Sequence, residues 1–147
     1  MGKVEYLARA MMRREGRVLV CRDRAHGHAY LPGGHVEFGE AAATAAAREL
    51  EEECGLLCRV VAPLLLWESR FVQRGKQKQE VTVVFHVEPL SGREWPEEVE
   101  SHEDHIAFEW IDPRNAVSNG VVPADVAAWL ERGGSGGLDW ISIDESE

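Results

Sequence analysis

Positive charge and long apolar runs are both scarce in this sequence. The chain carries 16 Lys and Arg against 26 Asp and Glu, which gives a formal net charge of −10 at pH 7. Proteins bind duplex nucleic acid largely by neutralising its phosphates with Lys and Arg, so we expect no partner of that class. No apolar run is long enough to cross a bilayer, and the N-terminal segment lacks the order of a secretory signal. We therefore expect a cytoplasmic protein with no membrane partner. An acidic chain can still act on an anionic small molecule when divalent cations mediate the contact.

Cysteine is rare as well. The three cysteines, Cys21, Cys54 and Cys58, cannot all pair, and nothing in the sequence indicates an oxidising compartment. Cys54 and Cys58 flank a glycine at the end of a predicted helix. With no further Cys or His nearby, this spacing is weak evidence for a zinc site. We expect buried free thiols.

The length of 147 residues fits a single domain, 1–147, with a single hydrophobic core. Apolar periodicity predicts two helices, at about 40–54 and 123–132, and a flexible glycine-rich hinge near 133–137 before a short C-terminal tail. Two N-terminal strands should form a hairpin around Glu15–Gly16, and a basic connector at 72–79 should link the next pair. The predicted strands are 4–13, 17–22, 59–71, 80–89 and 106–111. Such a mixture indicates an α/β or α+β sandwich.

The first predicted helix ends in a cluster of glutamates. Because a helix turns about 100° per residue, Glu52 and Glu53 lie within about 60° of Glu49, on either side of it. Glu51 lies about 200° round from Glu49 and points elsewhere. An apolar stripe at helical spacing should hold this helix against a sheet; its members are Ala43, Ala46, Ala47, Leu50 and Cys54.

These clustered carboxylates need a counter-charge, because like charges at this spacing destabilise a helix. Arg48 is the only cation in the helix, and it can satisfy Glu51 or Glu52 but not the whole group. Clustered oxygen ligands suit Mg²⁺ or Mn²⁺. The alternative is a solvated acidic helix face that holds no metal.

The segment from Gly34 to Leu56 resembles the signature of the Nudix hydrolases. It matches G-x5-E-x7-R-E-U-x-E-E-x-G-U at every position over 23 residues, with Leu50 and Leu56 at the bulky aliphatic positions U. The resemblance implies an α/β fold, an α/β/α sandwich with a mixed sheet, in which this segment forms a loop-helix-loop. It also implies Mg²⁺-dependent hydrolysis of a nucleoside diphosphate linked to another moiety, with Mn²⁺ as a substitute ion.

The resemblance also assigns roles to residues at the matching positions. It implies that the metal ligands are Glu49, Glu52, Glu53 and the carbonyl oxygen of Gly33. Arg48 would orient the glutamates and take part in catalysis. The residues Gly34, Glu40 and Gly55 would support the backbone and the start and end of the helix.

The general base stays open between two places. Glu52 is the candidate inside the matching segment, and Glu53 also belongs to the catalytic group. The acidic loop before the strand 106–111 offers Glu100, Glu103 and Asp104, of which we favour Glu103. A solvated run of charge is the alternative for that loop.

Several residues outside the matching segment are candidates for binding the rest of the substrate. Aromatic faces can stack on a base, and the candidates are Tyr30, Trp67, Phe71 and Trp95. The basic residues Arg70, Arg74, Lys76 and Lys78 could hold a terminal phosphate or a partner subunit, or simply form an exposed connector.

Three other functions compete with hydrolysis. One is a Nudix-like module that binds a nucleotide without cleaving it, which the complete set of carboxylates disfavours. Another is an isomerase on the same fold, which would depart from the strict signature. The last is an acidic protein without a metal site. A homodimer is among the expected states, because related proteins often dimerise.

Overall fold

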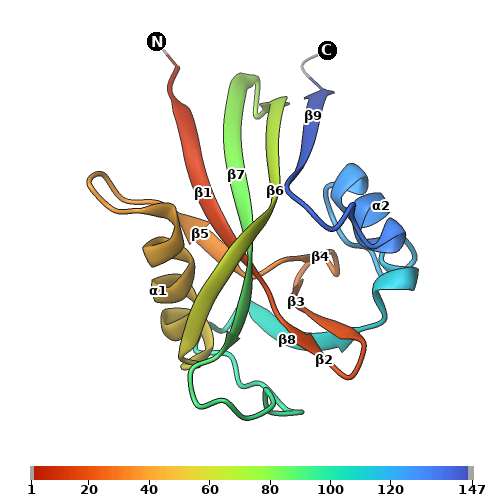
Figure 1. Ribbon diagram of the computed structural model, residues 1–147. Coiled ribbons are helices and arrows are strands. Elements are labelled where there is room, and N and C mark those ends of the chain that lie inside the picture. Colours follow the sequence, from red (N-terminus) through yellow and green to blue (C-terminus); the bar gives the residue numbers. More distant parts are fainter. Residues whose placement is uncertain (1, 146–147) are drawn as a thin grey trace.

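Two β-sheets and two helices make up the computed structural model, which describes residues 2–145 (Figure 1). The strands are β1 (Val4–Met11), β2 (Arg13–Arg14), β3 (Arg17–Asp23), β4 (Ala29–Tyr30), β5 (Gly33–His35), β6 (Cys58–Gln73), β7 (Lys76–Pro89), β8 (Ile106–Ile111) and β9 (Asp139–Glu145). The helices are α1 (Ala42–Cys54) and α2 (Ala124–Arg132), and a 3-10 turn, η1 (Pro113–Asn115), follows β8. The last two residues of the predicted tail, 146–147, lie outside the described part of the chain.

The larger sheet is mixed and has its strands in the order β5-β1-β7-β6-β9. β1 runs parallel to β7 and β9 parallel to β6, whereas β6 pairs with β7 and β1 with β5 in antiparallel fashion. One cluster of buried residues lies between this sheet and α1, and another lies on the side of α2 (Figure 1). The predicted α/β fold with a mixed sheet is therefore confirmed. Within residues 2–145, neither helix has the length and apolar character needed to cross a bilayer.

The predicted N-terminal hairpin is wrong for most of its length. All eight residues of β1 pair with β7 in the larger sheet, not with β3. Only β2 pairs with β3 around the turn at Glu15–Gly16, and β3 continues into a smaller sheet with β4 and β8. Adjacent buried methionines explain the change of sheet: Met11 packs into the α2-side core and Met12 into the α1-side core. The chain therefore passes from one layer to the next at this point.

The hairpin of β6 and β7 is longer than the sequence indicated. Most of the predicted connector 72–79 is strand, and Gln73 pairs directly with Lys76. The turn consists of Arg74 and Gly75, which have φ angles of 53° and 75°. Two consecutive left-handed residues match the twist of the flanking strands, so the hairpin can close without a longer loop.

α1 packs on the larger sheet through small side chains. It begins at Ala42, rather than at about Glu40 as predicted. Ala45 and Leu50 are fully buried, whereas Ala47, which we placed in the apolar stripe, is only partly buried. Alanine methyl groups allow the helix to lie close to the strands, which fixes the side chains that follow in its last turn.

α2 covers the other side of the larger sheet, with Trp129 buried in the core. The Trp129 Nε1 donates to Asp139 Oδ2 at 2.8 Å, and the backbone N–H of Ser135 donates to the same oxygen at 2.9 Å. The glycine-rich segment 133–137 is thus attached at its centre to the first residue of β9. Its flexibility stays a prediction.

We expect Leu50→Ala to lower the free energy of unfolding by about 2–5 kcal/mol, because it removes a fully buried side chain between α1 and the sheet. Urea denaturation followed by circular dichroism measures this loss. Leu57→Ala is the matched control, since Leu57 is 53% exposed, and it should change the stability by less than about 0.5 kcal/mol. Equal losses in the two variants would contradict the packing described for α1.

Candidate active site

Arg48 organises the acidic end of α1. Its Nε and Nη2 donate to the two oxygens of Glu40 at 2.8 and 3.0 Å. Its Nη1 donates to Glu49 Oε1 at 3.1 Å and to Glu52 Oε2 at 3.3 Å. Nη2 also donates to the carbonyl oxygen of His35 at 3.0 Å. These bonds, above all those to Glu40, hold the pKa of Arg48 above its usual range. One guanidinium therefore ties two glutamates of the helix to the loop that precedes it.

Two adjacent glycines let β5 lie between β1 and α1. A Cβ atom on Gly34 would stand 2.6 Å from the Cδ and Oε1 atoms of Glu49. A Cβ on Gly33 would stand 2.1 Å from the carbonyl oxygen of Ala8, and the φ angle of Gly33 is 148°. Both distances are too short for a real side chain. The Glu49 carboxylate can lie directly against β5 only because glycine occupies position 34.

Glu53 is buried although it carries a carboxylate. Its side chain lies in the sheet-facing side of α1, with Oε2 at 3.9 Å from the Sγ of Cys21 in β3. Burial, together with the nearby carboxylates of Glu49 and Glu103, raises the pKa of Glu53 to about 8. Desolvation and repulsion both disfavour its negative charge, and the charge of Arg9 offsets them only in part.

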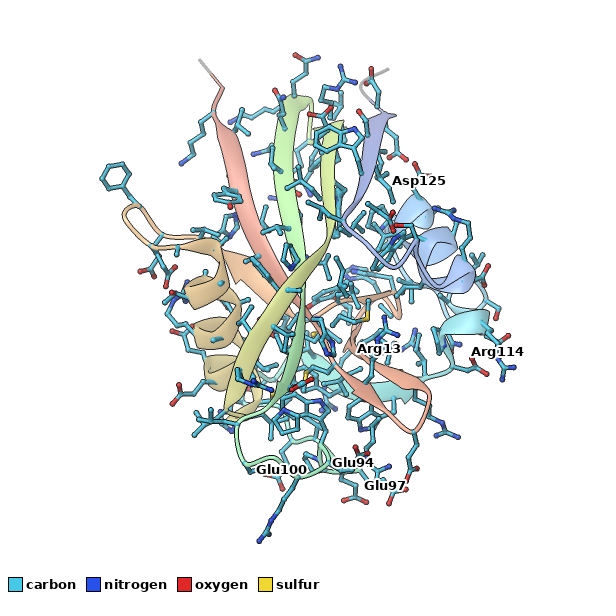
Figure 2. The ribbon with its side chains drawn as sticks, viewed as in Figure 1. Arg13, Glu94, Glu97, Glu100, Arg114 and Asp125 are labelled. Carbon is cyan, nitrogen blue, oxygen red and sulfur yellow. The ribbon has the colours of Figure 1, made fainter. Side chains whose placement is uncertain are left out.

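The acidic loop before β8 is attached to the end of α1. The backbone N–H of His102 donates to the carbonyl oxygen of Glu53 at 2.7 Å. Ser101 Oγ accepts from the N–H of Glu103 at 3.1 Å and donates to its carbonyl oxygen at 2.7 Å, which fixes the loop locally. Glu100 is exposed and labelled on the outside of this loop in Figure 2. Of the loop carboxylates considered from the sequence, Glu103 is thus the one whose charge acts on Glu53.

The donor set fits a divalent cation. Glu49 and Glu53 approach each other, the charge of Glu103 acts on Glu53, and Glu53 has no guanidinium or ammonium group in salt-bridge contact among the described residues. Mg²⁺ and Mn²⁺ prefer such carboxylate oxygens. Among residues 2–145, no three His, Cys, Asp or Glu side chains already surround one point, and Arg48 holds Glu49 and Glu52. The ligand set of Gly33, Glu49, Glu52 and Glu53 therefore stays a prediction.

A cavity of about 650 Å³ lies on the α2 side of the larger sheet. It brings together three of the four aromatic residues singled out in the sequence, and its lining includes Arg9, Tyr30, Trp67, Phe71, Val126 and Ile143. Burial raises the pKa of Tyr30 to about 12, and the charge of Glu53 contributes to this shift. None of the α1 glutamates lines the cavity, but Tyr30 in its lining is close enough for the charge of Glu53 to act on it. Trp95 is buried in the α1-side core instead and presents no face to it.

The amino-acid sequence matches the family model of the NUDIX domain over residues 6–131. The chain belongs to the NUDIX family. Among solved structures, the MutT protein from Methanosarcina mazei Go1 is 25% identical, with 89% of this chain and 93% of that chain covered and a TM-score of 0.66. The Escherichia coli ORF135 protein is also 25% identical, with 88% of each chain covered and a TM-score of 0.62. A Streptococcus suis ADP-ribose pyrophosphatase shares the fold at 18% identity and a TM-score of 0.58, over 94% of this chain and 98% of that one.

Family membership confirms the resemblance found in the sequence. It identifies this NUDIX chain as a hydrolase that acts on phosphorus-containing anhydrides. The matching segment forms β5, the following loop and α1, and Gly55 ends the helix with its N–H bonded to the carbonyl oxygen of Glu51. The predicted helix is therefore present and ends at the predicted glycine, whereas the roles of its glutamates stay a prediction.

Sequence reasoning did not single out two residues that lie close to the cavity or to Glu53, Arg9 and Cys21. Both sit in strands: Arg9 in β1 beside the cavity, and Cys21 in β3 against Glu53. Arg9 carried a signal that could have been noticed, since it interrupts the otherwise apolar run "LARAMM" with a charge. Cys21 carried none, because a buried thiol inside a strand is ordinary.

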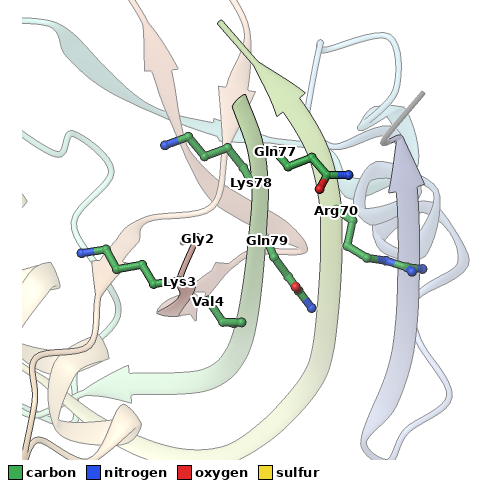
Figure 3. A pocket seen from close by; sticks show the side chains of 7 residues that line it. All are labelled: Gly2, Lys3, Val4, Arg70, Gln77, Lys78 and Gln79. Atoms are coloured by element: carbon green, nitrogen blue, oxygen red, sulfur yellow. The ribbon is translucent and has the colours of Figure 1, made fainter. Parts of the chain in front are cut away.

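The basic residues of the β6–β7 hairpin lie apart from the glutamates. The turn at Arg74 is at one end of the larger sheet, and the last turn of α1 is at the other (Figure 1). A separate hollow at the hairpin end is lined by Lys3, Arg70 and Lys78, among others (Figure 3). Arg70 is paired with Asp144 at 3.5 Å. These residues are therefore an exposed basic end of the sheet rather than part of the carboxylate cluster.

We expect Gly34→Ala to weaken Mn²⁺ binding strongly while leaving the protein folded, because the added methyl group displaces the flexible end of Glu49 rather than the backbone. Isothermal titration calorimetry with Mn²⁺ measures the affinity. Gly39→Ala, in the same loop, meets no atom within 4 Å but has a φ angle of 84°. It should lower the stability by about 1 kcal/mol and leave the Mn²⁺ affinity unchanged. An unchanged Mn²⁺ affinity in Gly34→Ala, together with weaker Mn²⁺ binding in Gly39→Ala, would exclude Glu49 as a ligand.

We expect metal-free Glu53→Gln to be more stable than the wild type at pH 8. The folded-state pKa of Glu53, about 8, lies above its ordinary value of 4.5. Between these two values the folded state binds more protons than the unfolded state, so wild-type stability falls as the pH rises through this window. Glutamine does not titrate. The gain, on the order of a few kcal/mol at pH 8, should shrink toward pH 5.

Thermal unfolding in EDTA from pH 5 to pH 8.5 measures this difference. Glu51→Gln is the control, because Glu51 is exposed on the same helix. A Glu53→Gln variant whose advantage is the same at every pH would show that burial does not raise the pKa of Glu53.

Proposed function

We propose that this NUDIX protein is a Mg²⁺-dependent pyrophosphohydrolase that cleaves the diphosphate of a nucleoside diphosphate linked to another moiety. The observation that carries this proposal is the buried Glu53 carboxyl, which is repelled by the charges of Glu49 and Glu103 and forms no ion pair among the described residues. A divalent ion would relieve their repulsion. The aromatic cavity lined by Tyr30, Trp67 and Phe71 would hold the nucleoside. Mn²⁺ is the expected substitute ion.

The carboxylates and Arg48 have separate roles in the proposed reaction. Glu49, Glu52, Glu53 and the carbonyl oxygen of Gly33 would hold the ion, and the ion would supply charge neutralisation for the diphosphate and a lowered pKa for a water molecule. Arg48 fixes the directions of Glu49 and Glu52 through its two Nη1 bonds. This positioning matters because phosphoryl transfer depends on placement and charge stabilisation more than on covalent catalysis.

Glu103 is the proposed general base. It lies on the loop that is bonded to the Glu53 carbonyl, and it takes no part in the hydrogen bonds of Arg48. Its carboxylate would accept the proton of the attacking water as the water oxygen bonds to phosphorus and the bridging anhydride bond breaks. Glu52 is the alternative base inside the helix, but Arg48 occupies one of its oxygens.

The proposed substrate class includes ADP-ribose-like sugar nucleotides, dinucleoside polyphosphates, and NTPs or dNTPs. Tyr30, Trp67 and Phe71 favour a flat base in the cavity, since aromatic faces stack on such rings. The similarity to a MutT protein and to an ADP-ribose pyrophosphatase supports substrates of this kind. The net charge of −10 disfavours duplex nucleic acid and is compatible with a cytoplasmic enzyme. Formation of a homodimer stays a prediction.

A non-catalytic nucleotide-binding module is the second candidate function. It would use the cavity in the same way but would not need the carboxylates. The complete glutamate set and its fixation by Arg48 favour hydrolysis. Release of products from a bound nucleotide distinguishes a hydrolase from a non-catalytic module.

We expect the wild type with Mg²⁺ to hydrolyse at least one member of a panel of ADP-ribose, other sugar nucleotides, diadenosine polyphosphates, and canonical and oxidised dNTPs. Product analysis by chromatography and mass spectrometry in H₂¹⁸O identifies the phosphorus that is attacked. Glu53→Gln should lower turnover by orders of magnitude. Glu51→Gln should retain it, because Glu51 is exposed and lies outside the hydrogen bonds of Arg48.

Two results would contradict this proposal. Binding of a nucleotide without any product would favour the non-catalytic module. A Glu53→Gln variant with full, metal-responsive activity would exclude Glu53 as a ligand.

A further inference from the structure

Arg9 is a partly buried arginine that has no carboxylate partner among the described residues. Its Nη1 donates to the carbonyl oxygen of Leu31 at 2.8 Å, and its guanidinium carbon lies 5.5 Å from the centre of the Tyr30 ring. Within residues 2–145, this is its one side-chain hydrogen bond, and it forms no ion pair. By contrast, Arg48 and Arg22 each donate to carboxylates.

Arg9 lies between the carboxylates and the cavity. It lines the cavity, and its positive charge lowers the pKa of both Glu53 and Cys21 against the larger effect of their burial. Its backbone pairs with Gly33 in β5, next to the predicted metal ligands. A ligand that extended from the glutamates into the aromatic cavity would therefore pass the Arg9 guanidinium.

The free donors of Arg9 are suited to an anion. A guanidinium has five N–H donors in a planar fork, and Arg9 uses one of them. Two parallel donors match the oxygens of a phosphate, and bonds to a charged group are stronger than neutral ones. The contacts with Leu31 and Tyr30 fix the fork before any ligand binds. Less conformational freedom is then lost on binding.

We propose that Arg9 binds the substrate phosphate nearest to the aromatic cavity, and so holds the nucleoside end of the diphosphate while the glutamates hold the other end. This inference rests on the proposed function, because the phosphate belongs to that substrate. It assigns to Arg9 a contact that requires no metal ion. It also separates the diphosphate into two ends: one held by the carboxylate site and one by a guanidinium on β1.

A purely structural role is the competing explanation. Arg9 could serve only to hold the Leu31 carbonyl, and with it the residues that lead to Gly33. In that case its replacement would lower the thermal stability and weaken the binding of nucleosides and of nucleotides equally. Phosphate binding would instead remove only the extra affinity that a phosphate provides.

The test compares nucleosides with their 5′-monophosphates in EDTA, so that no metal contributes. Adenosine, guanosine, cytidine and uridine, and AMP, GMP, CMP and UMP, are titrated by calorimetry or by ligand-detected NMR. In the wild type, at least one monophosphate should bind about ten- to hundredfold more tightly than its nucleoside, as expected for charged hydrogen bonds. Arg9→Met should abolish this difference, and Arg9→Lys should restore part of it.

Two further variants control for position and folding. Arg70→Met is the matched control, because Arg70 lines the same cavity but is paired with Asp144. In this variant the phosphate difference, which is the tighter binding of a monophosphate than of its nucleoside, should persist. Arg9→Gln removes the charge and keeps an amide donor that can reach toward Leu31. It replaces Arg9→Met if the latter does not fold, and it should lose the phosphate difference too.

The proposal is overturned if the wild type binds no monophosphate more tightly than its nucleoside, or if Arg9→Met and Arg9→Gln keep the difference. Failure of the proposed function would have another outcome: the phosphate difference would depend on Arg9, but no substrate would be hydrolysed with Mg²⁺. Hydrolysis with an unchanged KM in Arg9→Met would refute the Arg9 contact alone.

Discussion

Burial of one carboxyl group constrains the whole site. Leu50 and the small alanines hold α1 against the larger sheet, and this packing takes the side chain of Glu53 out of water. The neighbouring carboxylates of Glu49 and Glu103 add repulsion to the loss of hydration. Packing energy from the apolar side of the helix thus offsets an unfavourable charge arrangement on the same helix. A divalent cation is the simplest partner for such an arrangement.

The scaffold around this carboxyl reduces the freedom of each neighbouring group. Arg48 joins Glu49 and Glu52 to Glu40, while Gly34 permits the close approach of β5 to Glu49. The loop that carries Glu103 is bonded to the end of the helix through His102. A helix, a strand and a distant loop are therefore held together around the end of α1.

Much of this arrangement could be predicted from local sequence. The glutamate spacing, the end of α1 at Gly55 and the limits of β8 depend on helical periodicity and on local turn chemistry, which act over a few residues. The partner of β1 could not be predicted in this way. An apolar strand next to a turn fits a hairpin, and only long-range pairing with β7 and the opposite burial of Met11 and Met12 excluded it.

The sequence by itself determined the family, the helix and the identity of the acidic residues, because these depend on residue types at fixed spacing. The tertiary structure alone decided that Glu53 is buried while Glu52 is exposed, and that Glu103 approaches them from another segment. It also decided that Arg9 and Tyr30 share one cavity. Burial and proximity arise from the packing of distant segments, and the order of residues along the chain does not encode those distances directly.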